Sequence, residues 1–110
     1  MSSNLESEKL IHITQLIYLH EGMELDFIAF ENVALPLLLK YGGSLILRVR
    51  PEGKAVIESE GEKPYEIHIL SFPSEEKLQF YLKDKERQQV LHLKEKSIRS
   101  VLLIKGQKIG

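Results

Sequence analysis

The sequence predicts an α+β domain in the order β-α-β-β-α-β, and three observations support this fold class. Short segments rich in β-branched and aromatic residues alternate with segments whose apolar residues recur every three or four positions. Glycine and proline mark the boundaries between these segments. The length of 110 residues suits one domain with one hydrophobic core. We therefore expect a flexible N-terminal segment over residues 1–9 and a single domain over residues 10–110.

The first strand and the first helix follow from residue type and spacing. Residues 10–19 are rich in β-branched and aromatic side chains, which favours a strand. A helix is expected over residues 24–41, with one apolar face. That face carries Met23, Phe27, Phe30, Ala34, Leu37 and Leu38. Pro36 removes a backbone donor, so it should kink the helix or tighten its last turns, and Gly42-Gly43 should end it.

The remaining elements alternate in the same way. Strands are expected over residues 44–50, 65–72 and 98–104, with a possible short extra strand over 54–59. Ser74 is a suitable N-cap for a second helix, which should break near Asp84 and continue to about residue 96. Asp84 should cap the second helical piece. This order predicts the ferredoxin-like architecture, a four-stranded antiparallel sheet with both helices on one face.

Composition excludes several function classes. The net charge of -1 gives no basic excess, so we expect no nucleic-acid partner. The absence of cysteine excludes disulfide scaffolds, thiol catalysis and cysteine-ligated zinc. Phosphate-binding loops, dinucleotide glycine motifs and nucleophile elbows are missing. No secretory signal or apolar run of spanning length is visible, so we expect a cytoplasmic protein with no membrane contact and no cofactor.

Alternation along the strands divides the sheet into two faces. The more apolar face should lie under the helices, and it is expected to carry Ile11, Ile13, Gln15, Ile17, Leu19, Leu45, Leu47, Val49, Tyr65, Ile67, Ile69, Ser71, Ile98, Ser100, Leu102 and Ile104. The other face mixes apolar and charged residues, namely His12, Thr14, Leu16, Tyr18, Ile46, Arg48, Arg50, Glu66, His68, Leu70, Phe72, Arg99, Val101, Leu103 and Lys105. Such a mixture is typical of a covered face that encloses a polar cavity, and a second copy of the sheet is the simplest cover.

Five residues of the mixed face are candidate ligand-binding residues. Arg48 carries a planar, always charged group suited to a carboxylate or enolate, although it could instead pair with Glu66 on the neighbouring strand. His68 and His12 are expected on one face, where either could act as a general base or serve structurally. Together with Glu66 they could also form a three-ligand metal site, but our preferred expectation is no metal. Tyr18 could supply a pocket wall or simply pack at an interface.

Several short motifs resemble the dimeric α+β barrel superfamily over roughly residues 10–106. They are the run Pro36-Leu37-Leu38-Leu39-Lys40-Tyr41-Gly42-Gly43 with Arg48 five residues on, Leu70-Ser71-Phe72-Pro73-Ser74, Phe80-Tyr81 and Val101-Leu102-Leu103-Ile104-Lys105-Gly106. The nearest resemblance is to a short domain family of unknown function with a Pro–Tyr-Gly-Gly–Arg run and a Phe-Pro-Ser turn. The resemblance implies a ferredoxin-like protomer, two sheets paired face to face, and a small cavity between sheet and helices or between sheets. It also implies relatives that include cofactor-free monooxygenases, muconolactone-type isomerases and haem-binding proteins.

Two hypotheses for function follow. The first is a homodimer that binds a small anionic or enolisable organic molecule between sheet and partner, with Arg48 and either His68 or His12 contacting it. The second is a non-catalytic binding or assembly module whose polar residues pair with one another. The chain departs from the family pattern at Ser44, at Val49-Arg50, at Ser71 and over residues 83–86. The departures near Ser44, Ser71 and Asp84 favour the second hypothesis. Whether any reaction is catalysed stays open at this point.

Overall fold

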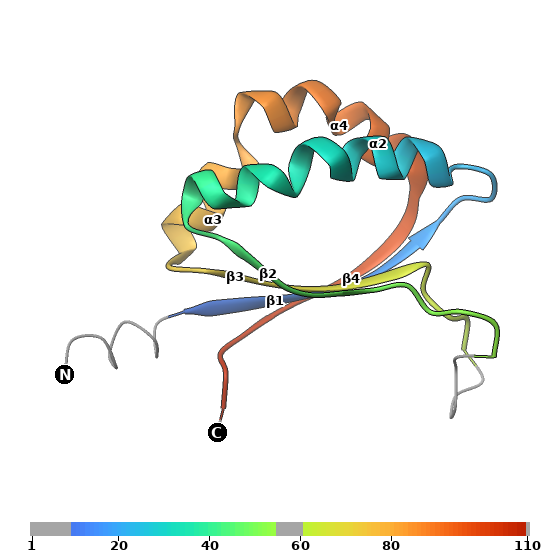
Figure 1. Cartoon of the computed structure of the whole chain (residues 1–110), viewed down its shortest axis with the longest axis horizontal. Helices are drawn as coiled ribbons and strands as arrows, with labels where there is room; N and C mark the ends of the chain where they lie inside the picture. The colour runs from blue at the N-terminus through green and yellow to red at the C-terminus, as the bar shows by residue number, and fades with distance from the viewer. Residues whose placement is uncertain (1–9, 55–60, 110) are drawn as a thin grey trace.

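The computed structural model describes residues 10–54 and 61–109, and these form two layers (Figure 1). One layer is an antiparallel four-stranded sheet in the order β2-β3-β1-β4. Its strands are β1 (Ile11–Leu19), β2 (Ser44–Val49), β3 (Glu66–Phe72) and β4 (Ile98–Gly106). The helices cover one face of the sheet, and they are α2 (Glu24–Ala34), η1 (Pro36–Tyr41), α3 (Glu75–Leu82) and α4 (Lys85–Ser97). This is the predicted ferredoxin-like α+β fold, while the expected flexible start and most of the possible strand at 54–59 lie outside the described residues.

The first helical segment changes character at Pro36, as its sequence predicts. The α-helix α2 ends at Ala34, and a 3-10 helix begins at Pro36, which has no backbone N–H to donate. Gly42 ends this segment with φ of 71°, a left-handed conformation that glycine adopts without steric cost. The chain therefore tightens and stops where proline and glycine require it.

Gly43 allows a close contact between the end of η1 and the sheet. A Cβ atom at this position would lie 2.9 Å from Cε1 of Phe72 and 3.2 Å from the carbonyl oxygen of Leu38. Both distances are shorter than an ordinary van der Waals contact. Only glycine therefore fits here without displacing the ring of Phe72 or the last turn of η1.

The second helical region breaks where the sequence predicts. The hydroxyl of Ser74 accepts a hydrogen bond from the backbone N–H of Lys77 and caps α3. Asp84 caps α4 by accepting from the backbone N–H groups of Glu86 and Arg87. The Asp84 carboxylate also accepts from the hydroxyl of Tyr41 at 2.5 Å, so the break between the two helices is tied to η1.

The assignment of strand faces is correct for β1 and wrong for β3. On β1, Ile13 and Ile17 are buried under the helices as expected. Their direct partners on β3 are Leu70 and Glu66, so the even-numbered residues of β3 also face the helices. The prediction preferred the more hydrophobic odd-numbered set. The prediction fails because Glu66 and His68 are buried together with partners of opposite charge, Arg50 and Glu31 respectively.

Two register shifts explain the remaining errors in face assignment. A shift between Leu45 and Leu47 places Leu47 opposite Ile69, on the outer face. A second shift at Tyr18 and Leu19 displaces β4 relative to β1. As a result Val101 pairs with Ile17 and lies under the helices, while Leu102 pairs with Leu16 and lies on the outer face. Arg48 and Arg50 likewise lie on the helix-facing side, where they reach acidic partners.

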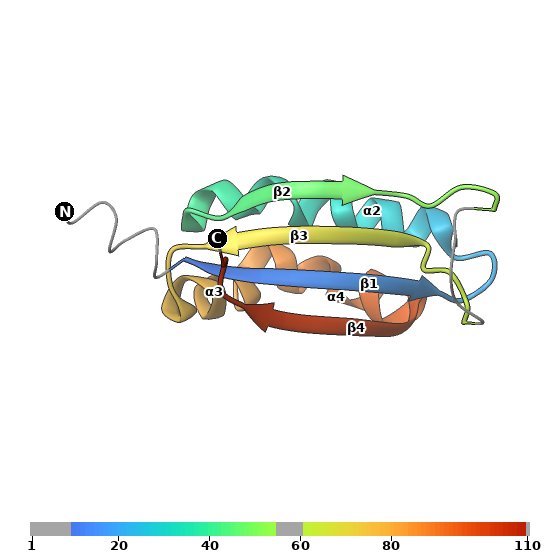
Figure 2. The same ribbon diagram turned by 90° about the horizontal axis from the view of Figure 1, so that it is seen from below.

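The outer face of the sheet carries no helix within the described ranges and can be followed in Figure 2. It is more apolar than predicted, because four polar residues assigned to it lie on the helix-facing side, namely Arg48, Arg50, Glu66 and His68. Its exposed apolar residues are Leu47, Val49, Leu102 and Ile104, and its half-buried ones are Leu16, Tyr18, Ile67 and Ile69. A continuous apolar patch of this kind is typical of an interface. Among the described residues, no helix combines the length and hydrophobicity that a membrane crossing requires.

Candidate functional site

A cavity of about 130 Å³ lies between the helices and the sheet. Most of its wall is apolar and comes from α2, α3, α4 and three strands. These apolar residues include Ile13, Ile17, Phe27, Phe30, Ala34, Leu70, Phe72, Tyr81, Val101 and Leu103. Polar side chains enter it at a few points only, namely Gln15, Glu31, His68, Arg87 and Lys94. An apolar cavity with a few convergent polar groups is the usual form of a small-molecule site.

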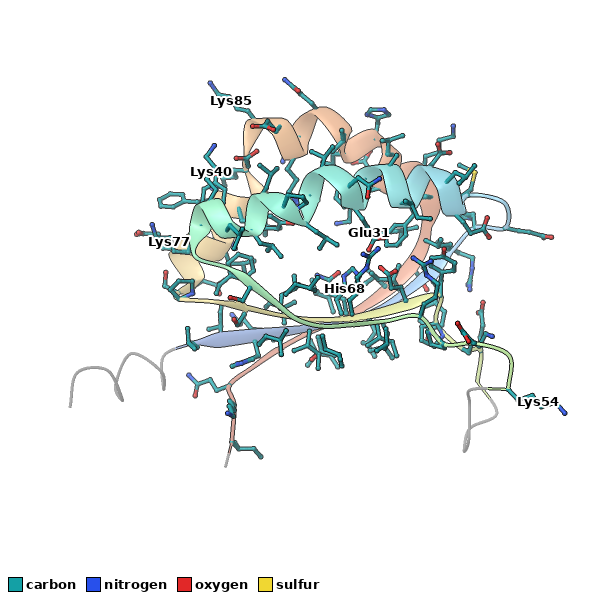
Figure 3. The ribbon with its side chains drawn as sticks, viewed as in Figure 1. Glu31, Lys40, Lys54, His68, Lys77 and Lys85 are labelled. Atoms are coloured by element: carbon teal, nitrogen blue, oxygen red, sulfur yellow. The ribbon has the colours of Figure 1, made fainter. Side chains whose placement is uncertain are left out.

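A network of charged residues borders this cavity at β2, β3 and α2. Figure 3 shows Glu31 pointing from α2 toward His68, which rises from the sheet. Nε2 of His68 lies 2.9 Å from Oε2 of Glu31 and 2.5 Å from Oε2 of Glu66. All three side chains are almost completely buried. A helix and a strand are therefore joined by one imidazole placed between two carboxylates.

Two arginines, Arg48 on β2 and Arg50 directly after it, balance these carboxylates from the more exposed side. Arg48 donates to Oε1 of Glu31 at 2.9 Å, and its Nε lies 3.4 Å from Oε1 of Glu66. Arg50 donates to the same Glu66 oxygen at 2.7 Å. The pairing of Arg48 with Glu66, left open by the sequence, is therefore present, and Arg48 also has a second partner on α2. Buried carboxylates require such partners, because an isolated buried charge is strongly unfavourable.

The surroundings of the network shift the pKa values of its two glutamates in opposite directions. Burial raises the pKa of the Glu31 carboxyl above its usual value. Burial also acts to raise the pKa of Glu66, but hydrogen bonds, that of His68 foremost, outweigh it and hold this pKa well below its usual range. Burial acts to lower the pKa of His68, but hydrogen bonds to the two carboxylates outweigh it and raise this pKa. Two carboxyl groups with opposite shifts around one imidazole form an arrangement that can hold and move a proton.

The same three residues also present a possible set of metal ligands. Glu31, Glu66 and His68 each offer one ligand atom, and these atoms lie within 4.8 Å of one another. This set differs from the one considered in the sequence, because Glu31 takes the place of His12. Arg48 and Arg50 already place two positive charges against the carboxylates, so a divalent cation would meet repulsion as well as attraction. The charge balance therefore disfavours a divalent cation at these three residues.

The structure brings together three of the five predicted site residues and separates the other two. Arg48, Glu66 and His68 lie in the network on the helix-facing side. The expectation that His12 and His68 share a face is wrong: His12 pairs with Ser71, and residues of β1 with even numbers face away from the helices. Tyr18 also lies on the outer face, where the guanidinium of Arg99 lies 5.8 Å from its ring. The error follows from the inverted assignment of β3.

Glu31 is the site residue that the sequence reasoning missed, although a signal for it exists. It lies four residues after Phe27 and three before Ala34, both of which belong to the predicted apolar face of the helix. A carboxylate at such a position is placed toward the core, and burial then requires a cationic or hydrogen-bonding partner. Arg48 and His68 supply these partners from the sheet.

The cavity reaches the molecular surface along β4. Val101 and Leu103 line it, yet they are 40% and 60% exposed. The polar network is at the β2 side of the sheet, and β4 forms the opposite edge. The cavity is therefore open at the β4 edge, and His68 and Glu31 line it further inside.

Comparison with known proteins finds structures of similar fold but no protein of similar sequence. No family model and no curated protein matches the chain. Among solved structures, it is similar to a protein of unknown function from Rhodopseudomonas palustris, with a TM-score of 0.80 and 16% identity over 94% of this chain and 85% of that one. It is also similar to a dimeric protein of unknown function with a ferredoxin-like fold from Bacteroides fragilis, with a TM-score of 0.64 and 11% identity over 91% and 97% of the two chains. A third is a DABB family protein with a ferredoxin-like fold from Mesorhizobium loti, with a TM-score of 0.63 and 15% identity over 92% and 98%. At these identities the likeness establishes the ferredoxin-like fold.

Proposed function

We propose that this protein binds a small organic molecule with an enolisable carbonyl or a phenolic hydroxyl in the cavity between the helices and the sheet. The observation that carries the proposal is the His68–Glu31 pair in the wall of an otherwise apolar cavity of about 130 Å³. Buried imidazole and carboxyl groups with shifted pKa values are typical of sites that accept or donate protons. The ligand thus lies under the helices of one chain rather than between its sheet and a partner.

His68 is the residue proposed to exchange a proton with the ligand. In its neutral form it would accept a proton from the ligand's acidic O–H or C–H bond, leaving a phenolate or enolate, and would return that proton to the same ligand or its tautomer. Glu31 and Glu66 would stabilise the imidazolium that forms, because both carboxylates lie within hydrogen-bond distance. The proposal needs no cofactor, because a proton is the only species transferred.

The alternative is a module that binds or assembles without chemistry. Its supporting observation is that Arg48 and Arg50 both donate hydrogen bonds to carboxylates of the same chain. In that case the network serves to fix α2 on the sheet. The binding protein that exchanges a proton requires His68 to contact the ligand, whereas the module without chemistry does not. An experiment can distinguish the two.

We further propose that the chain forms a homodimer of the dimeric α+β barrel type through the outer face of its sheet, and that it is cytoplasmic. The apolar patch around Leu102 and Ile69 lies on that face, and the charge of Arg99 beside it is paired with Glu62. A protein of the same fold from Bacteroides fragilis is described as dimeric. We also propose that the chain is a member of the short domain family with a Pro–Tyr-Gly-Gly–Arg run.

The test of ligand binding uses phenol, which matches the size and chemistry of the cavity. Binding is followed by NMR through the methyl groups of Leu70 and Val101, which line the cavity. We expect phenol to shift these methyl signals, and His68→Gln to weaken binding about tenfold, while His92→Gln on the exposed side of α4 leaves it unchanged. Equal binding by the wild type and His68→Gln would favour the module without chemistry. Unchanged methyl signals in the wild type would reject the cavity as the site.

A further inference from the structure

Arg87 is a buried cation for which the described part of the chain provides no anionic partner. It lies in the first turn of α4, is 7% exposed and lines the cavity. Its guanidinium lies 5.5 Å from the ring centre of Phe30 and 5.2 Å from that of Tyr81. One terminal nitrogen donates to the carbonyl of Leu82 at 3.3 Å, but the buried Nε has no hydrogen-bond partner. Buried arginines are normally paired with acidic groups, so this one is unusual.

Lys94 adds a second positive charge to the same part of the cavity. It lies seven residues after Arg87, which places both on one face of α4, and it lines the same cavity. Burial lowers the pKa of the Lys94 ammonium, and the charge of Arg87 lowers it further. Among the residues described, no carboxylate lies within ion-pair distance of either side chain.

The carboxylate of Asp84, the N-cap of α4, already has hydrogen-bond partners. Asp84 caps the helix through Oδ1, and its Oδ2 accepts from Tyr41 and Lys40. The charges of Glu31 and Glu66 are likewise balanced, by Arg48 and Arg50. The cavity therefore has one polar region whose charges are balanced and a second, at α4, that is cationic and unbalanced.

We propose that the ligand of this cavity is a small monocarboxylate whose carboxylate lies at Arg87 and Lys94 and whose apolar body extends toward His68. This inference rests on the proposed function, because it takes the cavity to be the ligand site. A carboxylate would supply an acceptor for the Nε group of Arg87 and a counter-charge for both cations. An anion of this kind would stabilise the charged form of Lys94.

The size of the cavity limits the ligand to about one aromatic ring or a branched aliphatic chain. An engineered apolar cavity of about 150 Å³ in another protein holds benzene, and this one is about 130 Å³. Its apolar wall disfavours phosphate esters and sugars, which carry too many polar groups for the few partners available. A carboxylate attached to an apolar group leaves only one charged end, and α4 supplies the groups that receive it.

The test compares benzoate with benzamide, which has nearly the same shape but no charge. Dissociation constants are measured by NMR at the Leu70 and Val101 methyl groups for the wild type, Arg87→Met, Lys94→Met and the control Lys85→Met. Lys85 is exposed on the same helix. We expect the wild type and Lys85→Met to prefer benzoate at least tenfold, and Arg87→Met to lose this preference. Lys94→Met should reduce it.

The ratio of the two ligands within each variant separates charge recognition from folding. If the wild type binds benzoate and benzamide equally, the carboxylate inference is overturned while the cavity remains a ligand site. If benzoate, benzamide and phenol all leave the cavity methyl groups unshifted, the proposed function fails as well. If Arg87→Met no longer folds, Lys94→Met decides, and an unchanged preference in that variant overturns the inference.

Discussion

Nε2 of His68 on β3 lies 2.9 Å from Oε2 of Glu31 on α2, so one titratable contact joins the helical layer to the sheet. Hydrogen bonding to this carboxylate is one of the causes that raise the pKa of His68. Glu31→Gln keeps the shape of the side chain but removes its charge. We therefore expect the pKa of His68 to fall toward 6.5 in this variant, as measured by an NMR titration of the imidazole protons. Glu76→Gln, at an exposed position on α3, is the control and should leave the pKa unchanged.

The pKa of His68 also predicts how stability depends on pH. Because this pKa is raised above 6.5 in the folded protein, the pairing of His68 contributes fully below pH 6.5 and is lost as pH rises through the folded pKa. The difference in unfolding free energy between the wild type and His68→Gln should thus be larger at pH 6 than at pH 9. Urea denaturation at the two pH values measures it. A difference that grows with pH would contradict the raised pKa.

Glu66 should be more important for stability than any exposed acidic residue. Its side chain is buried and pairs with His68 and Arg50, so Glu66→Gln leaves buried donors with a weaker acceptor. We expect a loss of about 2 kcal/mol in unfolding free energy. The control is Glu62→Gln, because Glu62 forms an exposed ion pair with Arg99 and should contribute less than about 1 kcal/mol. Chemical denaturation of the three proteins compares them, and equal losses would reject a structural role for burial.

A charge placed on the outer face of the sheet should separate the proposed dimer. Leu102 is half exposed at 51% on this face, and Leu102→Asp would place a carboxylate inside a contact between two sheets. Light scattering should give twice the chain mass for the wild type and 12.7 kDa for the variant. Leu25→Asp, at an exposed position of α2, should retain the mass of the wild type. A wild-type mass of one chain would remove the dimer proposal.

The capping role of Asp84 can be separated from its charge. Its pKa is lowered to about 2 because the carboxylate accepts hydrogen bonds from the hydroxyl of Tyr41 and the backbone of α4. The ammonium group of Lys40 also donates to it and lowers the pKa further. The charged Asp84 carboxylate therefore stabilises the folded protein above its usual pKa of 3.8, and this stabilisation is lost as pH falls toward 2. Asp84→Ala should lower the thermal midpoint more than Asp84→Asn, because asparagine can still cap the helix. Equal midpoints for the two variants would show that capping contributes little.

The order of elements could be predicted because local chemistry determines it. Pro36 and Gly42 end the first helical segment for reasons contained in their own backbones, and Ser74 and Asp84 cap the next two helices with their own side chains. None of these effects requires knowledge of distant residues. The break between α3 and α4 was predictable for the same reason.

The faces of β2, β3 and β4 could not be predicted in the same way, because they depend on pairing between strands. Hydrophobicity alone favours Ile67 and Ile69 for the interior of β3, yet Glu66 and His68 are buried there. Their burial depends on Arg48 from β2, on Arg50 directly after it and on Glu31 from α2, which only the folded chain brings together. The register shift at Tyr18 and Leu19 inverts the alternation of β4 in a similar manner, and no local residue signals it.

The close packing at Gly43 links the turn after η1 to the size of the cavity. The ring of Phe72, which a side chain at this position would strike, also forms part of the cavity wall. A change from glycine to alanine would push the ring inward or move the turn outward, and either movement would change the shape of the cavity. The volume under the helices thus depends on a backbone position that has room for a hydrogen atom and for no side chain.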